Sequence, residues 1–310
     1  MKKVIVRLGN GLGNQLFTYA AAYSFAKKNN AKLLVDDESG LSKKVDKTRG
    51  YKYELHNFNI SAEIAERKYK FIGLFGKAKK TILKKVSKFN PNYKFLTESK
   101  DKNKLTNYNP DQLNITFNNN LYFEGYFQSE KYYKSNMQDL FKEFSFKNNI
   151  TNQSNPIIND IKNNNSVSIH LRQDKFLADE NHKNLSKLNS EFLKHNIDLI
   201  KRGIDFFDKN LKNPKYFVWS NNFSGIKWLF DTKKFTLVNE NFNNDPAYDL
   251  YLMSLCKHFI LSPSTMHYWA AALCRNSNKI CLSPLKINNQ SGYYGFSNNK
   301  DIKADWWKEI

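Results

Sequence analysis

Residues 4–17, VIVRLGNGLGNQLF, pass from an apolar strand into a glycine-rich turn and then into a helix. We predict the strand at residues 4–8 and the helix at residues 15–28, where apolar side chains recur at helical spacing. A second apolar strand is predicted at residues 31–36. Such a β-α-β unit predicts a parallel sheet with helices on its faces.

The alternation of strands and helices begins again in the second half of the chain. Predicted strands lie at residues 167–171, 215–220, 235–238 and 259–262, and predicted helices at residues 189–207, 247–256 and 265–273. Polar, asparagine-rich stretches at residues 90–116 and 147–165 are predicted to be loops, the second of them between the two halves. We therefore expect two α/β domains, residues 1–155 and 156–310, with ligand binding in a cleft.

Composition narrows the class of protein. The chain has 310 residues, of which 40% are hydrophobic, so it has enough apolar material for a core. Its 49 Lys and Arg against 29 Asp and Glu give a net charge of +20, which predicts a polyanionic neighbour: nucleic acid, an anionic membrane or a phosphorylated small molecule. Neither the three cysteines nor the histidines have metal-ligand spacing, so no metal site is expected. With no apolar run approaching about 20 residues, we expect a cytoplasmic protein, soluble or peripheral on a membrane.

The glycine-rich turn carries the first candidate site. Gly11 and Gly13 let the backbone approach a ligand closely at a helix N-terminus. Asp36 and Asp37 lie at about the position of the acidic residue that binds the ribose in a dinucleotide site, so an NAD-dependent oxidoreductase is one alternative. The third glycine of the turn comes one residue early for that motif, and Asn14 stands where close helix packing favours Gly or Ala.

Two further candidate sites lie in the second half. His170 and Arg172 share one face at a strand end, where the arginine offers forked donors for phosphate; the alternative is a cluster that ties the strand to a loop. Ser264 and Thr265 follow another strand and can cap a helix or, with its free amides, bind phosphate. Asp249 begins a helix, as a binding residue or simply as helix-start charge.

Residues 77–88 combine lysines with apolar residues at helical spacing. Such a segment lies on an anionic membrane surface, or it is a solvated helix with one buried stripe. The same charge would suit a basic nucleic-acid-binding protein, but the chain has no compact aromatic and basic RNA motif.

Five blocks, in order along nearly the whole chain, resemble glycosyltransferase family 11, the bacterial-type α-1,2-fucosyltransferases. They are GLGNQLF at residues 11–17, GYFQSEKY at 125–132, HLRQD at 170–174, FVWSNN at 217–222 and DLYLMSLCKHFILSPSTMHYW at 249–269. The resemblance implies an α/β fold of the GT-B type, in which two Rossmann-like domains face each other across a cleft and the C-terminal half binds the donor.

The resemblance also implies the reaction. It is a metal-independent, inverting transfer of L-fucose from GDP-β-L-fucose to a galactoside hydroxyl, with the GDP-sugar as co-substrate and no further cofactor. The acceptor would be an oligosaccharide or a lipid-linked glycan in surface-glycan synthesis, and nucleic acid would not be a partner. Residues 77–88 would then contact the anionic inner face of the membrane.

Residue roles follow from the same resemblance. Arg172 would neutralise the leaving GDP, and His170 and Asp249 would recognise the guanosine. Ser264 and Thr265 would hold the phosphates at their helix N-terminus.

On the other half of the chain, Asn14 would orient the sugar or the attacking hydroxyl. Asp174 and Glu124 are the acids to test first as the general base. The remaining residues of the expected donor-binding set are Gly11, Gly13, Gln15 and Ser220.

The chain departs from the family pattern in two places. The family's His-x-Arg-Arg-x-Asp is His170-Leu171-Arg172-Gln173-Asp174 here, without the second arginine and one residue shorter. The family's Ser-Asp-Asp is Ser220-Asn221-Asn222, so two acids have become amides. The first departure lies in the donor site, and another GDP-deoxysugar or GDP-heptose is therefore the alternative donor.

Overall fold

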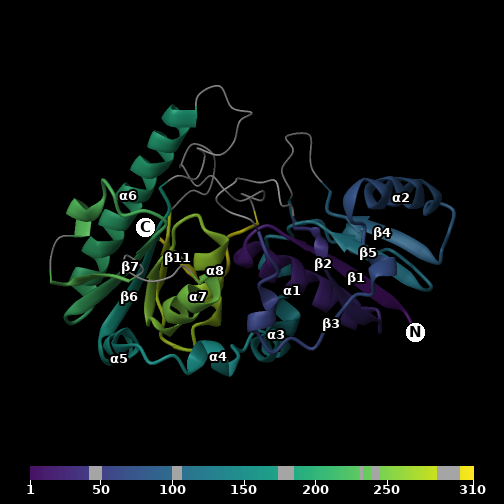
Figure 1. Ribbon diagram of the computed structural model, residues 1–310. Helices are drawn as coiled ribbons and strands as arrows, with labels where there is room; N and C mark the ends of the chain where they lie inside the picture. Colours follow the sequence, from purple (N-terminus) through teal and green to yellow (C-terminus); the bar gives the residue numbers. More distant parts are fainter. Residues whose placement is uncertain (42–50, 100–106, 174–184, 231–232, 239–244, 285–300) are drawn as a thin grey trace. The chain divides into compact units, whose positions relative to one another are not determined.

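The computed structural model describes residues 1–41, 51–99, 107–173, 185–230, 233–238, 245–284 and 301–310. The chain divides into two compact units, Met1–Lys147 with Lys300–Ile302, and Asn148–Asn299 with Lys303–Ile310. Each unit is built on its own parallel sheet with helices, which confirms the predicted α/β class (Figure 1). The domain boundary expected after residue 155 lies between the fourth and fifth helices and stays a prediction.

The first unit has a five-stranded sheet in the order β3-β2-β1-β5-β4, and all neighbouring strands are parallel. Its strands are β1 (Lys3–Gly9), β2 (Lys32–Gly40), β3 (Glu63–Ile64), β4 (Tyr93–Thr97) and β5 (Asn120–Glu124). Its helices are α1 (Leu12–Lys28), α2 (Gly73–Val86) and α3 (Met137–Glu143). Short 3-10 turns lie at Leu55–Asn57, Arg67–Tyr69, Asp111–Leu113, Glu130–Tyr132 and Lys134–Asn136.

The two faces of this sheet bury different side chains. Phe123 of β5 contacts Phe25 of α1, with ring centroids 5.7 Å apart. Ile5 and Tyr122 point to the opposite face by strand alternation and belong to a cluster with Phe71. Because β1 is buried from both sides, its apolar run is continuous rather than alternating.

The second unit has a six-stranded sheet in the order β11-β10-β9-β6-β7-β8, again all parallel. Its strands are β6 (Asn165–Leu171), β7 (Pro214–Ser220), β8 (Phe235–Leu237), β9 (His258–Ile260), β10 (Cys281–Ser283) and β11 (Trp307–Glu309). Its helices are α4 (Asn148–Thr151), α5 (Pro156–Asn163), α6 (Leu185–Asn210), α7 (Pro246–Leu255) and α8 (Thr265–Leu273), with a 3-10 turn at Lys227–Phe230. Read from β8, the chain-order sequence of strands is 3-2-1-4-5-6, the Rossmann arrangement.

Strand β6 shows how this sheet assigns its two faces. Val167, Ile169 and Leu171 join a core cluster that includes residues of α6. Ser168 and His170 alternate with them and face the other way, where both meet His267 of α8. The apolar face of β6 therefore makes core, and its polar face is available for a site.

Most predicted elements are confirmed with small shifts at their ends, but two predicted loops are wrong in part. Residues 93–97 form β4, because Tyr93 and Phe95 pack on the Ile5 cluster although their flanks are polar. The polar stretch 147–165 contains α4 and α5. The three-residue strands β10 and β11 were not predicted, since a pattern that short carries little periodicity.

The ends of β1 and β2 approach each other so closely that both need glycine. A Cβ atom on Gly9 would lie 2.9 Å from the Gly40 carbonyl oxygen, and a Cβ on Gly40 would lie 1.9 Å from the Leu8 carbonyl oxygen. Gly11 differs, because its φ is −71° and a Cβ there would lie 3.8 Å from the nearest atom, on Tyr51. Neither backbone strain nor packing among the described residues explains that glycine.

These glycines give a matched stability test. We expect Gly40→Ala to lower the free energy of unfolding by about 3 kcal/mol or more, since the clash is with backbone and cannot relax by side-chain rotation. Gly11→Ala is the control and should change it by about 1 kcal/mol at most. Urea unfolding followed by circular dichroism measures both, and equal stabilities for the two variants would contradict the close approach of β1 and β2.

Candidate functional site

The second sheet has its topological switch point between β6 and β9. These strands are parallel neighbours at the centre of the sheet, and the chain leaves them for different partners on either side. In open parallel sheets, ligands bind beyond the carboxyl ends of the strands at such a point. His170 lies near the end of β6 and Arg172 directly follows it, and the turn that contains Ser264 follows β9. The fold therefore brings two of the candidate motifs to one edge.

Helix α8 begins at this edge and is capped by a serine. The Ser264 hydroxyl accepts a hydrogen bond from the His267 amide, with the oxygen 3.4 Å from the nitrogen. The amides of Thr265 and Met266 precede that capped position, in the first turn, where a helix has no carbonyl partners of its own. Helix N-termini of this kind bind phosphate, and Ser264 and Thr265 are both half-exposed.

A buried histidine holds this edge together. The Ser262 amide donates to Nδ1 of His267 at 3.4 Å, so the ring proton belongs on Nε2, which lies 3.1 Å from the Ser168 hydroxyl oxygen. Burial, reinforced by the nearby His170, lowers the pKa of the His267 ring well below its usual range. The His170 ring packs edge-on against this neutral ring, with centroids 5.8 Å apart. His267 thus fixes where His170 can lie.

The two departures from the family pattern meet in space. The backbone amide of Gln173 donates a hydrogen bond to the Asn221 side-chain oxygen at 2.8 Å. The Gln173 side chain donates to the carbonyls of Asn222 and Ser224. Gln173, in place of the family's arginine, therefore contacts the Asn221 side chain through its backbone and the Asn222 backbone through its side chain, with no charged group in either contact.

Ser220, at the end of β7, belongs to the same turn. Its hydroxyl donates to the Asn222 carbonyl at 2.6 Å and accepts from the Asn222 amide at 3.2 Å. The side chain is 4% exposed. These hydrogen bonds fix the conformation of the turn. The expected contact of Ser220 with the GDP-sugar stays a prediction.

Asp249 lies in the first turn of α7 and is half-buried. Burial, together with the Asp245 carboxylate, raises the pKa of the Asp249 carboxyl to about 7, although the Trp219 side chain acts in the opposite direction. Trp219 is paired in register with His170 on the neighbouring strand, so both side chains leave the same face of the sheet. A carboxyl group that titrates near neutrality beside such a strand end is a candidate binding group.

The first sheet has its own switch point, between β1 and β5. Asn10 follows β1 with φ +59°, the left-handed region, and its side-chain amide donates to the Tyr126 hydroxyl at 3.2 Å. Phe127 follows β5 with φ +49° although its side chain is fully buried. Such conformations persist only where the surroundings enforce them, and they cluster at functional sites.

Glu98 enforces the conformation of the second turn. Its carboxylate accepts hydrogen bonds from the amides of Tyr126 at 2.6 Å and Phe127 at 2.9 Å. A Cβ atom on Gly125 would lie 2.4 Å from the Glu98 Cβ, so only glycine fits there. The turn after β5 is therefore built around one buried carboxylate.

Asn14 lies in the first turn of α1, next to this turn. Its side-chain oxygen accepts from the Gln128 amide at 2.8 Å, which orients the Asn14 NH₂ group away from Gln128. Thr18 adds a hydrogen bond from its hydroxyl to the Gly125 carbonyl at 2.9 Å. An oriented amide donor on a helix N-terminus suits a sugar or phosphate oxygen.

Gln15 is fully buried and bonded to backbone on every side. Its amide nitrogen donates to the carbonyls of Asn10 and Lys52, each at 2.8 Å, and its oxygen accepts from the Glu54 amide at 3.0 Å. The side chain thereby fixes the glycine-rich turn. Its expected contact with the donor stays a prediction.

Glu124 is held by lysines of α2. Lys80 pairs with one carboxylate oxygen, while the other accepts from the Thr97 hydroxyl at 2.9 Å and lies 3.5 Å from Lys84. Burial acts to raise the pKa of the Glu124 carboxyl, but the hydrogen bond and charge of Lys80 outweigh it and the pKa is lowered. These contacts favour a structural role, and the expectation that Glu124 is a general base is untested.

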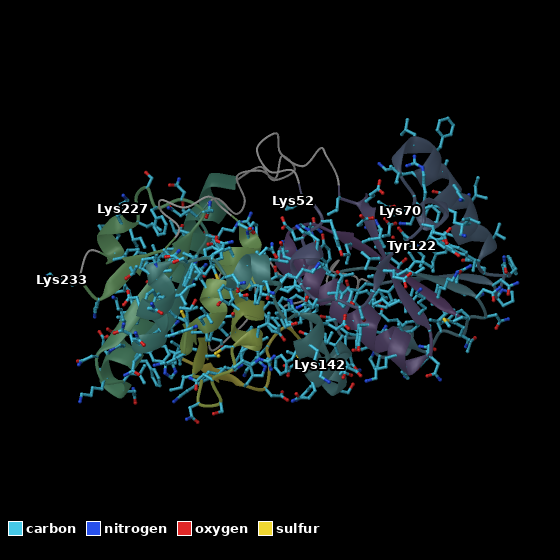
Figure 2. All side chains as sticks on the ribbon, turned by 60° about the horizontal axis from the view of Figure 1, so that its bottom comes forward. Lys52, Lys70, Tyr122, Lys142, Lys227 and Lys233 are labelled. Carbon is cyan, nitrogen blue, oxygen red and sulfur yellow. The ribbon has the colours of Figure 1, made fainter. Side chains whose placement is uncertain are left out.

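The aspartates of the dinucleotide alternative are engaged within the protein. Asp36 is fully buried and accepts from the Tyr122 hydroxyl at 2.7 Å and from the Ser39 amide at 2.9 Å. Asp37 pairs with Lys70 at 2.6 Å (Tyr122 and Lys70 are labelled in Figure 2). Neither carboxylate is presented as a ribose ligand.

Asp174 lies outside the described residues. Among the described residues, no group of three or more His, Cys, Asp or Glu side chains could hold a metal ion. Sequence patterns missed the residues that support the turns: His267, Trp219, Glu98 and Gln128. The blocks at residues 125–132, 217–222 and 249–269 contained three of them, but nothing local marked them as supports.

The two switch points, with a glycine turn in one unit and a capped helix N-terminus in the other, are the places where doubly wound α/β enzymes bind their ligands. The chain belongs to glycosyl transferase family 11, whose sequence profile matches residues 3–309. The resemblance drawn from the five blocks is confirmed.

Relatives and solved structures agree with this assignment. The chain is similar to an alpha-1,2-colitosyltransferase of Escherichia coli, with 25% identity over 92% of both chains. It is also similar to the O-antigen biosynthesis glycosyltransferase WbnK of Escherichia coli, with 25% identity over 97% of this chain and 98% of the other. Its fold is similar to that of NodZ alpha-1,6-fucosyltransferase, crystallised and soaked with GDP-fucose: the TM-score is 0.52, with 14% identity over 88% of this chain and 92% of that one. The predicted GT-B-type fold is confirmed.

The amide contact at the end of β6 can be tested by a double-mutant cycle. Asn221→Ala removes the acceptor of the Gln173 backbone amide, and Gln173→Ala removes the side-chain donor to the Asn222 and Ser224 carbonyls, so each should lower the free energy of unfolding by about 1 kcal/mol. Because both side chains hold the same turn, the double variant should lose less than the sum of the two losses, with an interaction energy of about 0.5 kcal/mol or more. Urea unfolding measures all four proteins, and strictly additive effects would contradict a shared role of the two side chains in this turn.

Proposed function

We propose that the protein transfers L-fucose from GDP-β-L-fucose to a galactoside hydroxyl in the synthesis of a surface glycan. The observation that carries this proposal is the edge of the second sheet, where Arg172, His170 and the capped N-terminus of α8 come together. The relative named for O-antigen biosynthesis supports a glycan acceptor, and the fold shared with a GDP-fucose-soaked fucosyltransferase is consistent with this donor.

In the proposed reaction, the acceptor oxygen attacks the anomeric carbon as the bond from that carbon to the phosphate oxygen breaks. GDP leaves with the electron pair, the anomeric configuration inverts, and the acceptor proton passes to a base. Asp174 remains the acid to test as that base, because Glu124 is held by Lys80 and Thr97.

Negative charge grows on the departing diphosphate and must be stabilised where it develops. Arg172 supplies a permanent positive charge with forked donors. The free amides at the start of α8, next to Ser264 and Thr265, add the positive end of a helix dipole.

Asp249 and His170 are the groups that would recognise guanosine. The Asp249 carboxylate can accept the ring N–H and amino group of guanine, and cytosine or uracil presents no such pair of neighbouring donors. His170, held in place by His267, offers an aromatic ring and a hydrogen-bonding nitrogen at the strand end.

In the first unit, Asn14 would orient the sugar or the attacking hydroxyl. Gln128 fixes its amide, and Gln15 fixes the turn before it. Gly11 and Gly13 would let the backbone come close to the ligand.

A second candidate donor is another GDP-activated deoxysugar. The relative named alpha-1,2-colitosyltransferase favours it, as does the neutral contact between Gln173 and Asn221 at the donor edge. Rates with GDP-fucose and with other GDP-deoxysugars as donors distinguish the two candidates.

Nucleotide binding tests the proposal directly. We expect GDP to raise the melting temperature, with no such effect from UDP or NAD, and EDTA to leave the effect of GDP unchanged.

The affinity for GDP should depend on pH. The carboxylate form of Asp249 would accept hydrogen bonds from guanine, and the pKa of this carboxyl group is about 7, so GDP should bind about tenfold more weakly at pH 6 than at pH 8.

Asp249→Asn is the control for that pH dependence. An asparagine does not titrate, so GDP affinity should be weaker and nearly constant between pH 6 and pH 8. Equal responses to GDP and UDP would remove the proposed donor class, and an unchanged pH profile in Asp249→Asn would remove Asp249 from guanine recognition.

Turnover tests the role of Arg172. Arg172→Ala should lower kcat by about a hundredfold or more, as expected for loss of one preorganised charged donor. Arg202→Ala, which removes an exposed arginine of α6, is the matched control and should leave kcat unchanged. A folded Arg172→Ala protein with near-normal turnover would assign Arg172 a structural role.

A further inference from the structure

Helix α2 and the turn after it present an apolar ridge to solvent, made by Leu74, Phe75, Ile82, Val86 and Phe89. Phe75, Ile82 and Val86 recur seven and four residues apart, so they share one side of the helix. The ridge residues are 84%, 93%, 61%, 49% and 90% exposed, respectively. Five of the eight large apolar side chains exposed among the described residues thus lie within one short segment, which marks an interaction surface.

The ridge is not needed to attach α2 to the sheet. Leu83, about a quarter of a turn around the helix from the ridge, packs with the cluster around Phe71 and Tyr122. Lys80 pairs with Glu124 of β5, and Lys84 lies 3.5 Å from the same carboxylate. Figure 1 shows α2 beside β4 and β5 at the outside of the first unit. No residue of α2 is fully buried, so its outward face is free of the core.

Lysines flank the ridge. Residues 73–89 contain six lysines and no acidic residue. An open groove of about 470 Å³ runs along the helix, lined by Lys77, Lys80, Thr81, Lys84, Lys85, Lys88 and Glu124. Glu124 forms ion pairs with Lys80 and Lys84. Among the described residues, no carboxylate forms an ion pair with Lys77, Lys85 or Lys88.

We infer that α2 docks the protein on an anionic lipid bilayer, with the apolar ridge at the boundary between headgroups and acyl chains and the lysines among the lipid phosphates. The helix has 14 residues, about 21 Å, so it would lie in the plane of the surface. Across the described residues, no helix has the length and hydropathy of a membrane span.

Charge and chemistry together favour a bilayer over other occupants. A second copy of the chain would bring two sets of six lysines together, at a cost in repulsion. A nucleic acid would satisfy the lysines, but it would leave the aliphatic Leu74, Ile82 and Val86 in water. An anionic bilayer satisfies both parts of the surface.

Co-sedimentation of the full chain with vesicles tests this inference without any donor or acceptor, so its result is independent of the proposed reaction. We expect binding to vesicles that contain phosphatidylglycerol and much weaker binding to pure phosphatidylcholine. Phe75→Ser with Phe89→Ser should weaken binding at least about tenfold. Lys77→Glu, Lys85→Glu and Lys88→Glu together should weaken it about a hundredfold, since each lysine contributes about fivefold.

Matched controls make the same chemical changes elsewhere. Lys147→Glu, Lys209→Glu and Lys212→Glu together alter the net charge equally at exposed sites, and Trp228→Ser removes an aromatic side chain that is 66% exposed. These controls should bind vesicles nearly as well as the parent protein. Urea unfolding, with a free energy of unfolding close to that of the parent, checks that the α2 variants are folded.

Three outcomes would overturn the inference: no binding to anionic vesicles, equal binding to neutral vesicles, or equal losses in the α2 variants and the controls. Self-association in analytical ultracentrifugation that Phe75→Ser abolishes, without vesicle binding, would assign the ridge to a second copy. Salt-sensitive binding to oligonucleotides in place of vesicles would assign the lysines to nucleic acid.

Discussion

Both units depend on one constraint, the order of parallel strands in each sheet. Because β6 lies beside β9, and β1 beside β5, the chain leaves neighbouring strands at their carboxyl ends in different directions. That edge is therefore filled by turns and helix N-termini rather than by regular packing, and it presents backbone amides and polar side chains. Arg172 and Ser264 reach one edge, and Asn14 and Gln128 the other, only because the strands are in this order.

Buried polar side chains keep these edges rigid. His267, Gln15 and Glu98 each make at least two hydrogen bonds inside the protein, and each acts on a turn that carries candidate ligand-binding groups. A buried polar group is stable only when its hydrogen bonds are made, so each of them admits one arrangement of its turn. Preorganised turns suit a transferase, in which charge must be stabilised as it develops on the leaving group.

The exposed surface of helix α2 is not explained by packing against the core. Its attachment uses Leu83, Lys80 and Lys84, and its remaining surface combines exposed apolar residues with lysines. Within the described part of the chain, the exposed apolar residues and the unpaired lysines take no part in the contacts between α2 and the sheet. The lysine run by itself left a membrane surface and a solvated helix with one buried stripe as equal alternatives. The exposure of Phe75 and Phe89 favours the membrane surface.

Local patterns in the sequence predicted β1, β2, β6, β7, β8 and β9, the glycine turn, the capped start of α8 and the family, because periodicity, glycine and capping residues act over a few neighbours. They missed β4, whose apolar residues are few and whose flanks are polar, and the short strands β3, β10 and β11. Three contacts became visible in the folded protein: Gln173 meets Asn221, Gln128 orients Asn14, and Lys80 holds Glu124. Those partners come from separate elements, and which of them meet depends on strand order and helix placement, which no local pattern specifies.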